Sequence, residues 1–145
     1  MQHVLGLTRL QVYLAHDRPL SPDELGALRA LVSRRARHEP VAHLLGTWEF
    51  HGHELEVGPE VLIPRPETEG LVDLMLGRLG EDADRVVDLG TGSGAVAIAL
   101  AMARPALHVT AVDISPAALA IAARNVRRHG LGERVRLVEG SWWEP

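Results

Sequence analysis

The order of hydrophobic and polar residues divides the chain into stretches of different periodicity. Residues 1 to about 15 are expected to be helical, although they carry no clear start signal. A second helix is predicted over 21–38, because apolar residues recur there every three or four positions. The run Ser21-Pro22-Asp23-Glu24 supplies a capping box with proline at the first helical position, and Pro40 prevents the helix from continuing.

The pattern changes to period two over 47–57, which predicts a β-hairpin that turns near His51-Gly52-His53. After an extended connector, Pro66 opens another helix, which Gly80 is expected to end. The predicted buried stripe of this helix consists of Leu71, Val72, Leu74, Met75 and Leu79.

From residue 85 onward, short apolar runs alternate with helical patterns. Strands are predicted near 85–89, 107–113 and 134–139, and helices near 93–103 and 116–129. This alternation indicates an α/β fold with a parallel sheet and right-handed crossovers. The sequence therefore predicts a small helical segment over 1–45, a β-hairpin linker over 46–64, and a nucleotide-binding α/β unit over 65–145.

Composition narrows the class of protein. A chain of 145 residues with 46% hydrophobic content is one modest globular domain or part of a larger one. No stretch is long and apolar enough to span a bilayer, and no secretory signal opens the chain, so a cytoplasmic location is expected. Without cysteine there are no disulfides and no thiolate metal sites. The net charge of −4 argues against a surface that binds nucleic acid.

Two histidines and two clusters of arginine are the other candidate groups. His51 and His53 share a face of the predicted hairpin, but no third metal ligand is evident, so no metal site is predicted. The arginines of 34–37 and 124–128 fall in the later turns of predicted helices, where positive charge complements the helix dipole. They are interpreted as solvated faces. Asn125 is expected to cap or pack within its helix.

The most informative stretch is Asp88-Leu89-Gly90-Thr91-Gly92-Ser93-Gly94, which follows the first strand of the α/β unit. Alternating glycines allow positive φ angles and close approach of a ligand. The helix that follows directs free N–H groups into the same crevice. The second strand ends on Asp113, whose carboxylate can accept hydrogen bonds from ribose hydroxyls. Loop, spacing and carboxylate together indicate a nucleoside cofactor.

The same run also satisfies the dinucleotide fingerprint in its G-x-G-x-x-A form, so NAD is an alternative to S-adenosylmethionine. Asp88, just before the first glycine, favours S-adenosylmethionine, because a carboxylate suits a ligand with a cationic sulfonium and ammonium. A pyrophosphate prefers N–H donors without a nearby negative charge.

The chain resembles the HemK/PrmC family of peptide-chain release factor glutamine-N5 methyltransferases over nearly its whole length. The runs that carry the resemblance are Glu39–Gly46, Leu62–Glu69, Val87–Ala95, Ala111–Asp113 and Ala123–Asn125. The glycine loop is common to class I methyltransferases, whereas Ile63-Pro64-Arg65-Pro66-Glu67-Thr68-Glu69 is far more specific. The resemblance implies the Rossmann-like fold of class I S-adenosylmethionine-dependent methyltransferases, of which this chain would hold the first half of the sheet. Residues 1–45 would be part of a substrate-recognition bundle.

The resemblance also implies roles for individual residues. Gly90, Thr91, Gly92, Ser93 and Gly94 would line the methionine and ribose part of S-adenosylmethionine. Asp113 would hold the ribose hydroxyls, and Trp142 would lie beside the adenine. Arg65 and Thr68 would close over the cofactor. Ser141 stands where related sequences often have aspartate, so one polar contact is expected to differ.

The family's catalytic signature, Asn-Pro-Pro-Tyr, is absent from this sequence. No catalytic residue is therefore assigned, and the 145-residue chain is expected to be inactive alone. The strand near 85–89 would also expose an unpaired edge, which predicts self-association. The implied partner is a release factor, methylated on the glutamine of its Gly-Gly-Gln motif. The alternatives are an adenine-N6 methyltransferase on nucleic acid, an NAD-dependent oxidoreductase, and a non-catalytic S-adenosylmethionine-binding protein.

Overall fold

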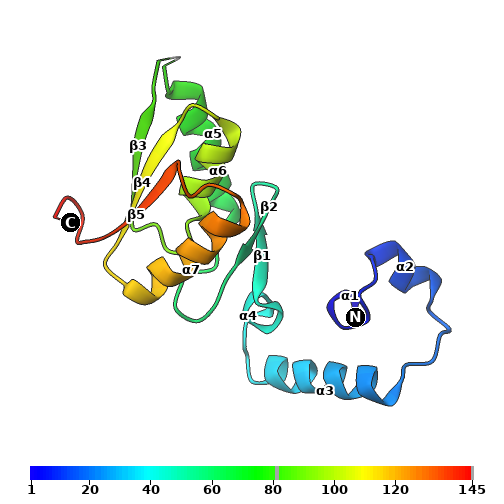
Figure 1. Cartoon of the computed structure of the whole chain (residues 1–145). Helices are drawn as coiled ribbons and strands as arrows, with labels where there is room; N and C mark the ends of the chain where they lie inside the picture. Colours follow the sequence, from blue (N-terminus) through cyan, green and yellow to red (C-terminus); the bar gives the residue numbers. More distant parts are fainter. Residues whose placement is uncertain (81, 145) are drawn as a thin grey trace. The chain divides into compact units, whose positions relative to one another are not determined.

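The computed structural model describes residues 1–80 and 82–144 (Figure 1). The chain divides into two compact units, Met1–Leu45 and Gly46–Pro145. The first contains helices only, and the second contains a β-hairpin and a parallel sheet with helices. Among the helices of the described residues, none has the length and hydrophobicity required to cross a membrane.

The helices of the first unit are α1 (Gln2–Leu5), α2 (Arg9–Leu14), α3 (Pro22–Ala36) and α4 (Val41–Leu45). The helical stretch predicted over 1–15 is therefore interrupted. Gly6 ends α1 in the left-handed conformation, and Thr8 starts α2 with a capping box. The capping box predicted for α3 is confirmed, because Ser21 and Glu24 exchange side-chain to backbone hydrogen bonds of 2.8 and 3.2 Å.

The arginines at the end of α3 are not a purely solvated face. The guanidinium of Arg34 pairs with the carboxylate of Glu39, which lies beyond the helix. This contact lowers the pKa of Glu39 below its ordinary value.

The second unit begins with a hairpin of β1 (Thr47–Phe50) and β2 (His53–Glu56), paired antiparallel as predicted. His51 and Gly52 both have positive φ angles, which is the backbone that a tight two-residue hairpin turn requires. Phe50 and Leu55 are fully buried and belong to the same hydrophobic core as the sheet. The hairpin is thus built into the second unit and packs as part of it.

Helix α5 (Pro66–Arg78) buries only part of the stripe predicted for it. Val72 is buried, but Leu71 and Leu74 are about half exposed, so their predicted burial was wrong. The helix packs against α6 along one side, which covers Val72, Met75, Leu76 and Leu79 at helical spacing and leaves the neighbouring leucines outside. The guanidinium of Arg104 donates to the carbonyls of Leu79 and Gly80 at the end of α5.

The sheet consists of β3 (Arg85–Leu89), β4 (His108–Asp113) and β5 (Val135–Glu139), all parallel, in the order β3-β4-β5. Helices α6 (Ala95–Ala103) and α7 (Pro116–Arg128) form the connections between the strands. These positions confirm the predicted alternation within two residues. Ser115 caps α7 by accepting a hydrogen bond from the backbone N–H of Ala118, as expected.

The helices cover one face of this sheet (Figure 1). Val109, Ala111 and Val135 point into the core beneath α6 and α7. Of the residues at the alternate positions, Val87 on β3 is 45% exposed. Among the described residues, β3 pairs only with β4, so it forms one edge of the sheet. The carboxyl ends of all three parallel strands meet at one end of the sheet, where the glycine loop, Asp113 and Trp142 lie.

Candidate functional site

The glycine loop leaves the end of β3 and is anchored to the neighbouring strand. The backbone N–H groups of Gly90 and Thr91 both donate to the carbonyl of Val112, at 2.8 and 2.9 Å. Gly94 then begins α6 with φ 82°. The loop therefore crosses the end of β4 before it enters the helix, and its conformation is fixed by main-chain contacts.

Two of the glycines are required for different reasons. Gly92 has φ 56°, and no atom beyond its chain neighbours lies within 4 Å of the position a Cβ would take, so the backbone conformation alone favours glycine there. At Gly94, a Cβ would lie 3.3 Å from Ile98 Cδ1 and 3.4 Å from Ala122 Cβ. Gly94 therefore also permits the close packing of the loop against α7.

Asp113 at the end of β4 is held against the glycine loop. Its Oδ2 accepts a hydrogen bond of 2.8 Å from the backbone N–H of Gly92. Its Oδ1 accepts one of 2.9 Å from the backbone N–H of Ser115. A carboxylate oxygen can accept more than one hydrogen bond. The carboxylate is thus fixed in orientation and keeps acceptor capacity for hydroxyl groups of a ligand.

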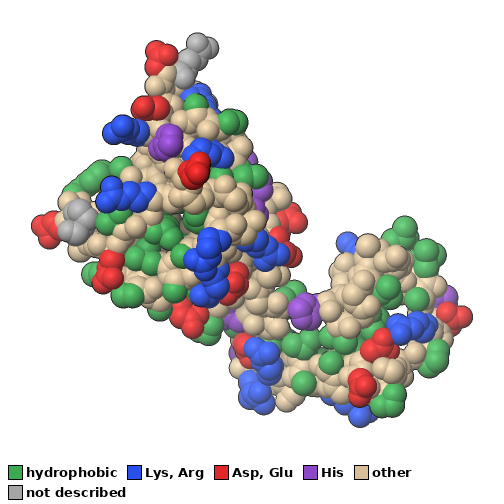
Figure 2. Space-filling view, viewed as in Figure 1, with side chains coloured by type: hydrophobic (Ala, Val, Ile, Leu, Met, Phe, Trp, Pro, Cys, Tyr) green, Lys and Arg blue, Asp and Glu red, His purple; other side chains and the backbone are tan. Residues whose placement is uncertain are grey.

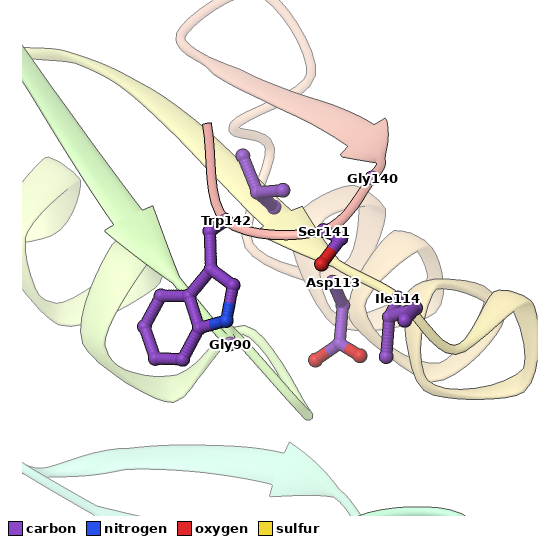
Figure 3. Close-up of a pocket in the computed structure, with 7 residues that line it drawn as sticks. Gly90, Asp113, Ile114, Gly140, Ser141 and Trp142 are labelled. Atoms are coloured by element: carbon purple, nitrogen blue, oxygen red, sulfur yellow. The ribbon is translucent and has the colours of Figure 1, made fainter. Parts of the chain in front are cut away.

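A cavity of about 200 Å³ opens beside this carboxylate (Figure 3). Its lining consists of Gly90, Val112, Asp113, Ile114, Gly140, Ser141 and Trp142. Complete small-molecule sites usually measure roughly 300–1,000 Å³. The cavity therefore accommodates part of a nucleoside-sized ligand, with an acidic group on one wall and an aromatic ring on another.

Trp142 lies after β5 in an unusual backbone conformation. Its φ is 55°, which is uncommon for a bulky residue. Backbone hydrogen bonds between Ser141 and Glu144, of 2.9 and 3.0 Å, close a tight turn around it. The indole is 72% exposed, and Figure 3 shows it projecting to the same side as the carboxylate of Asp113. The ring is therefore accessible to a planar ligand group.

Asp88 lies under the loop and is partly buried. The hydroxyl of Thr91 donates to its Oδ2 at 2.7 Å. Burial raises the pKa of Asp88 above its ordinary value, and the negative charge of Asp113 adds to this effect. Hydrogen bonds from Thr91 and from the backbone of Ala97 oppose it. A cation beside this carboxylate would relieve the cost of its charge.

The structure brings only some of the sequence-predicted residues to the cavity. Gly90, Asp113 and Trp142 line it. Thr91 and Ser93 are buried, and the side chain of Thr91 is turned toward Asp88. Thr91 and Ser93 can therefore offer a ligand only their backbone groups, because their side chains are buried.

Arg65 and Thr68 lie at the start of α5 and do not line this cavity. Arg65 occupies the N-cap position without a side-chain cap, and the backbone N–H of Thr68 donates to its carbonyl at 3.0 Å. Sequence reasoning passed over Ile114 and Gly140, which do line the cavity. The sequence signal that could have found them is their position directly after β4 and β5.

The hairpin histidines have other partners. His51 Nε2 lies 2.9 Å from Oδ1 of Asp73, and the His53 ring makes an edge contact with the ring of His129. Burial and the neighbouring histidines lower the pKa of His53. Within residues 1–80 and 82–144, no group of three potential metal ligands comes together.

The glycine loop and Asp113 at the carboxyl end of a parallel sheet form the arrangement expected of a class I S-adenosylmethionine-dependent methyltransferase domain. Comparison with known families agrees, since residues 1–46 match the PrmC N-terminal domain and residues 86–144 match a methyltransferase domain. These matches confirm the resemblance to the HemK/PrmC family. S-adenosylmethionine is accordingly the cofactor, and the NAD alternative is set aside.

Curated relatives support the same family. A release factor glutamine methyltransferase of Geobacter sulfurreducens is 50% identical over 141 residues, covering 97% of this chain and 49% of the relative. Its counterpart in Bordetella pertussis is 51% identical over 145 residues, covering 99% of this chain and 53% of the relative. The chain thus spans about half the length of these relatives.

Solved structures agree on the fold. A protein from Pyrococcus horikoshii superimposes with a TM-score of 0.54 at 14% identity, covering 66% of this chain and 36% of that chain. At 14% identity the similarity supports the fold alone.

Proposed function

We propose that this chain binds S-adenosylmethionine and supplies the cofactor half of a release factor glutamine methyltransferase. The reaction would transfer a methyl group to the side-chain amide nitrogen of the glutamine in a Gly-Gly-Gln motif. The observation that carries the proposal is the hydrogen bond between Gly92 and Asp113, in a chain whose relatives of 50% identity are named for this activity. The whole protein's activity and substrate remain part of the proposal, because the chain spans about half of those relatives.

The residues present fit the cofactor. Gly90 and Gly92 leave the open side of the loop free of side chains, while Thr91 and Ser93 would contribute backbone groups. Asp113 would accept hydrogen bonds from the ribose hydroxyls, and Trp142 would lie along the adenine. The carboxylate of Asp88 supplies negative charge for the cationic part of the ligand. When bound, S-adenosylmethionine would supply an electrophilic methyl group.

Arg65 and Thr68 are proposed to contact the cofactor only after the start of α5 moves toward the cavity. They do not line the cavity, so this assignment depends on a closure step. An Arg65→Ala variant tests it, because only closure onto the ligand would weaken binding.

Methyl transfer requires the acceptor nitrogen to be aligned about 3 Å from the methyl group, so positioning supplies much of the rate. No residue of this chain is proposed to carry out that alignment. We expect residues 65–145 to form part of the cofactor-binding domain, with the hairpin of 46–64 packed into it, and residues 1–45 to contact the release factor. Because release factors act in translation, the proposal implies a cytoplasmic location.

A radiolabel transfer assay tests the activity. The 145-residue chain is incubated with tritiated S-adenosylmethionine and a release factor that carries Gly-Gly-Gln, with a Gly-Gly-Ala version as control. The expected result is no transfer by this chain and transfer by a full-length relative. Turnover by the chain would contradict the assignment of no catalytic residue. Transfer to DNA adenine would favour the nucleic-acid alternative.

Self-association through β3 is proposed for this chain as well. Val87 is 45% exposed on a strand that pairs on one side only among the described residues. Such an edge is a template for pairing with another chain. Light scattering is expected to show dimers or larger species, reduced by Val87→Lys. A strictly monomeric wild-type chain would contradict this.

A further inference from the structure

Asn125 is a fully buried polar residue in the interior of α7. It is 0% exposed, and every hydrogen-bonding group of its side chain has a partner. The amide nitrogen donates to the carbonyl of Ser93 at 2.9 Å and to the carbonyl of Glu56 at 3.0 Å. The amide oxygen accepts from the backbone N–H of Glu56 at 2.7 Å. None of these bonds caps or stabilises α7 itself.

These partners belong to two different parts of the second unit. Ser93 lies in the glycine loop, whereas Glu56 is the last residue of β2 in the hairpin. Asn125 therefore joins the cofactor loop to the end of the hairpin by a single side chain. Helix α7 packs beside β2, as Figure 1 also shows.

A second contact fixes the loop on the same face of α7. Gly94 packs so closely on Ala122 that a Cβ at this glycine would lie 3.4 Å from Ala122 Cβ. Positions 122 and 125 are three residues apart and lie on one helix face. The loop is thus pressed against α7 at Gly94 and held by a hydrogen bond at Ser93, which together set where Gly92 meets Asp113.

The other contacts between α7 and the hairpin lie at the surface. Arg124 pairs with the Glu56 carboxylate at 2.7 Å, and Arg128 pairs with that of Glu54. Basic and acidic side chains accordingly lie side by side over α7 and the hairpin in Figure 2. Exposed pairs of this kind contribute little to stability. A buried amide that loses a partner is costly, so the hairpin and the loop cannot shift independently.

We propose that Asn125 is a positioning residue that holds the glycine loop in its cofactor-ready conformation and couples it to the hairpin. The inference deepens the proposed cofactor-binding function and rests on it. The hairpin is also tied to α5, because the backbone N–H of His51 donates to Glu69 at 2.8 Å. Asn125 therefore links the cofactor loop with a hairpin that is itself anchored to α5.

The test compares Asn125→Leu, which keeps the approximate size and loses all three hydrogen bonds, with Val126→Ala. Val126 is the next residue of α7 and is buried in the core. Both variants lower stability, so temperatures are chosen equally far below each melting point. Amide exchange of Gly92 and Gly94 is measured by NMR without ligand, and binding of S-adenosylhomocysteine is measured by calorimetry.

The expected result is exchange at Gly92 and Gly94 about tenfold faster in Asn125→Leu than in Val126→Ala, with binding weaker by a similar factor. Should Asn125→Leu not fold, Asn125→Ala gives the same comparison, because it also removes all three hydrogen bonds. Equal exchange rates in the two variants would overturn the inference. Absence of binding by the wild-type chain would overturn the proposed cofactor function, while the ligand-free exchange rates still decide the role of Asn125.

Discussion

The carboxylate of Asp113 accepts a hydrogen bond of 2.8 Å from the backbone N–H of Gly92. The acidic end of β4 and the glycine loop after β3 are therefore joined directly. A loop restrained in this way has less conformational freedom to lose when a ligand binds. It also means that the carboxylate has both a structural role in the loop and the proposed role at the ribose.

Asp113→Ala is expected to weaken binding of S-adenosylhomocysteine at least about tenfold, because the variant loses the ribose acceptor and the anchor of Gly92. Ser115→Ala is the matched control. It removes the α7 cap at a cost of about 1 kcal/mol in stability and leaves the carboxylate in place. Calorimetry and thermal unfolding are measured on both. Equal loss of affinity in the two variants would count against a ligand role for Asp113.

Substitution of two loop glycines is expected to separate binding from stability. Gly94→Ala should be the more destabilising, because its Cβ meets Ile98 and Ala122 in addition to the cost of a positive φ, which is about 1 kcal/mol. Gly92→Ala carries only the φ cost, because its Cβ would meet no atom within 4 Å, and it adds a methyl group to the loop that is proposed to contact the ligand. Gly92→Ala should therefore lose more affinity for S-adenosylhomocysteine than Gly94→Ala, although it loses less stability.

The control for both is Gly70→Ala within α5, where a Cβ meets nothing within 4 Å and φ is ordinary. It should raise stability by up to about 1 kcal/mol and leave binding unchanged. Thermal unfolding gives the stability order and calorimetry the affinity order. If Gly94→Ala lost more than Gly92→Ala in both stability and affinity, the proposed position of the ligand would be contradicted.

The raised pKa of Asp88 predicts that the stability of the fold depends on pH. Burial raises the pKa of this carboxyl in the folded state above its unfolded value. Its contribution to stability is therefore complete below the unfolded pKa and is lost as the pH rises through the raised folded pKa. Asp88→Asn should melt at a higher temperature than wild type at pH 7, and the difference should shrink as the pH falls.

The same substitution should weaken binding of S-adenosylmethionine more than binding of S-adenosylhomocysteine, because only the former carries the sulfonium charge. Asp113→Ala is the control, and it should weaken binding of both ligands to the same extent. Binding constants at pH 7 for the two ligands and the two variants provide the comparison. An equal effect of Asp88→Asn on both ligands would show that its carboxylate does not face the sulfonium.

Phe50→Ala is expected to destabilise the second unit by about 3–5 kcal/mol, since Phe50 is fully buried in the core shared with the sheet. Trp48→Ala, on the same strand but 37% exposed, should cost clearly less. Denaturant unfolding of both variants tests whether the hairpin folds as part of this unit. A small effect of Phe50→Ala would show that the hairpin unfolds separately.

Much of this architecture follows from local sequence. The capping residues Ser21 and Ser115 determine where helices begin, and the alternation at 47–57 determines the hairpin, because these signals depend on near neighbours alone. Gly6 interrupts the first predicted helical region, since a left-handed glycine ends a helix that hydrophobic spacing would continue.

Other features depend on contacts distant in sequence. Leu71 and Leu74 carry a helical pattern, but their burial depends on which side of α5 meets α6. The role of Asn125 follows from its contact with Glu56, 69 residues away, which no local pattern encodes. The sequence brings the glycine loop and Asp113 together, because they lie at the carboxyl ends of two adjacent strands. It does not fix the position of Arg65, because that residue lies at the start of α5 and at the end of no strand.

Calorimetric titration of the wild-type 145-residue chain with S-adenosylhomocysteine, alongside NAD and alongside Asp113→Ala, tests the cofactor assignment most directly. The account predicts saturable binding of S-adenosylhomocysteine, its loss or strong weakening in Asp113→Ala, and no binding of NAD. Binding of NAD by the wild-type chain, or no binding of S-adenosylhomocysteine by a chain shown to be folded, would contradict it.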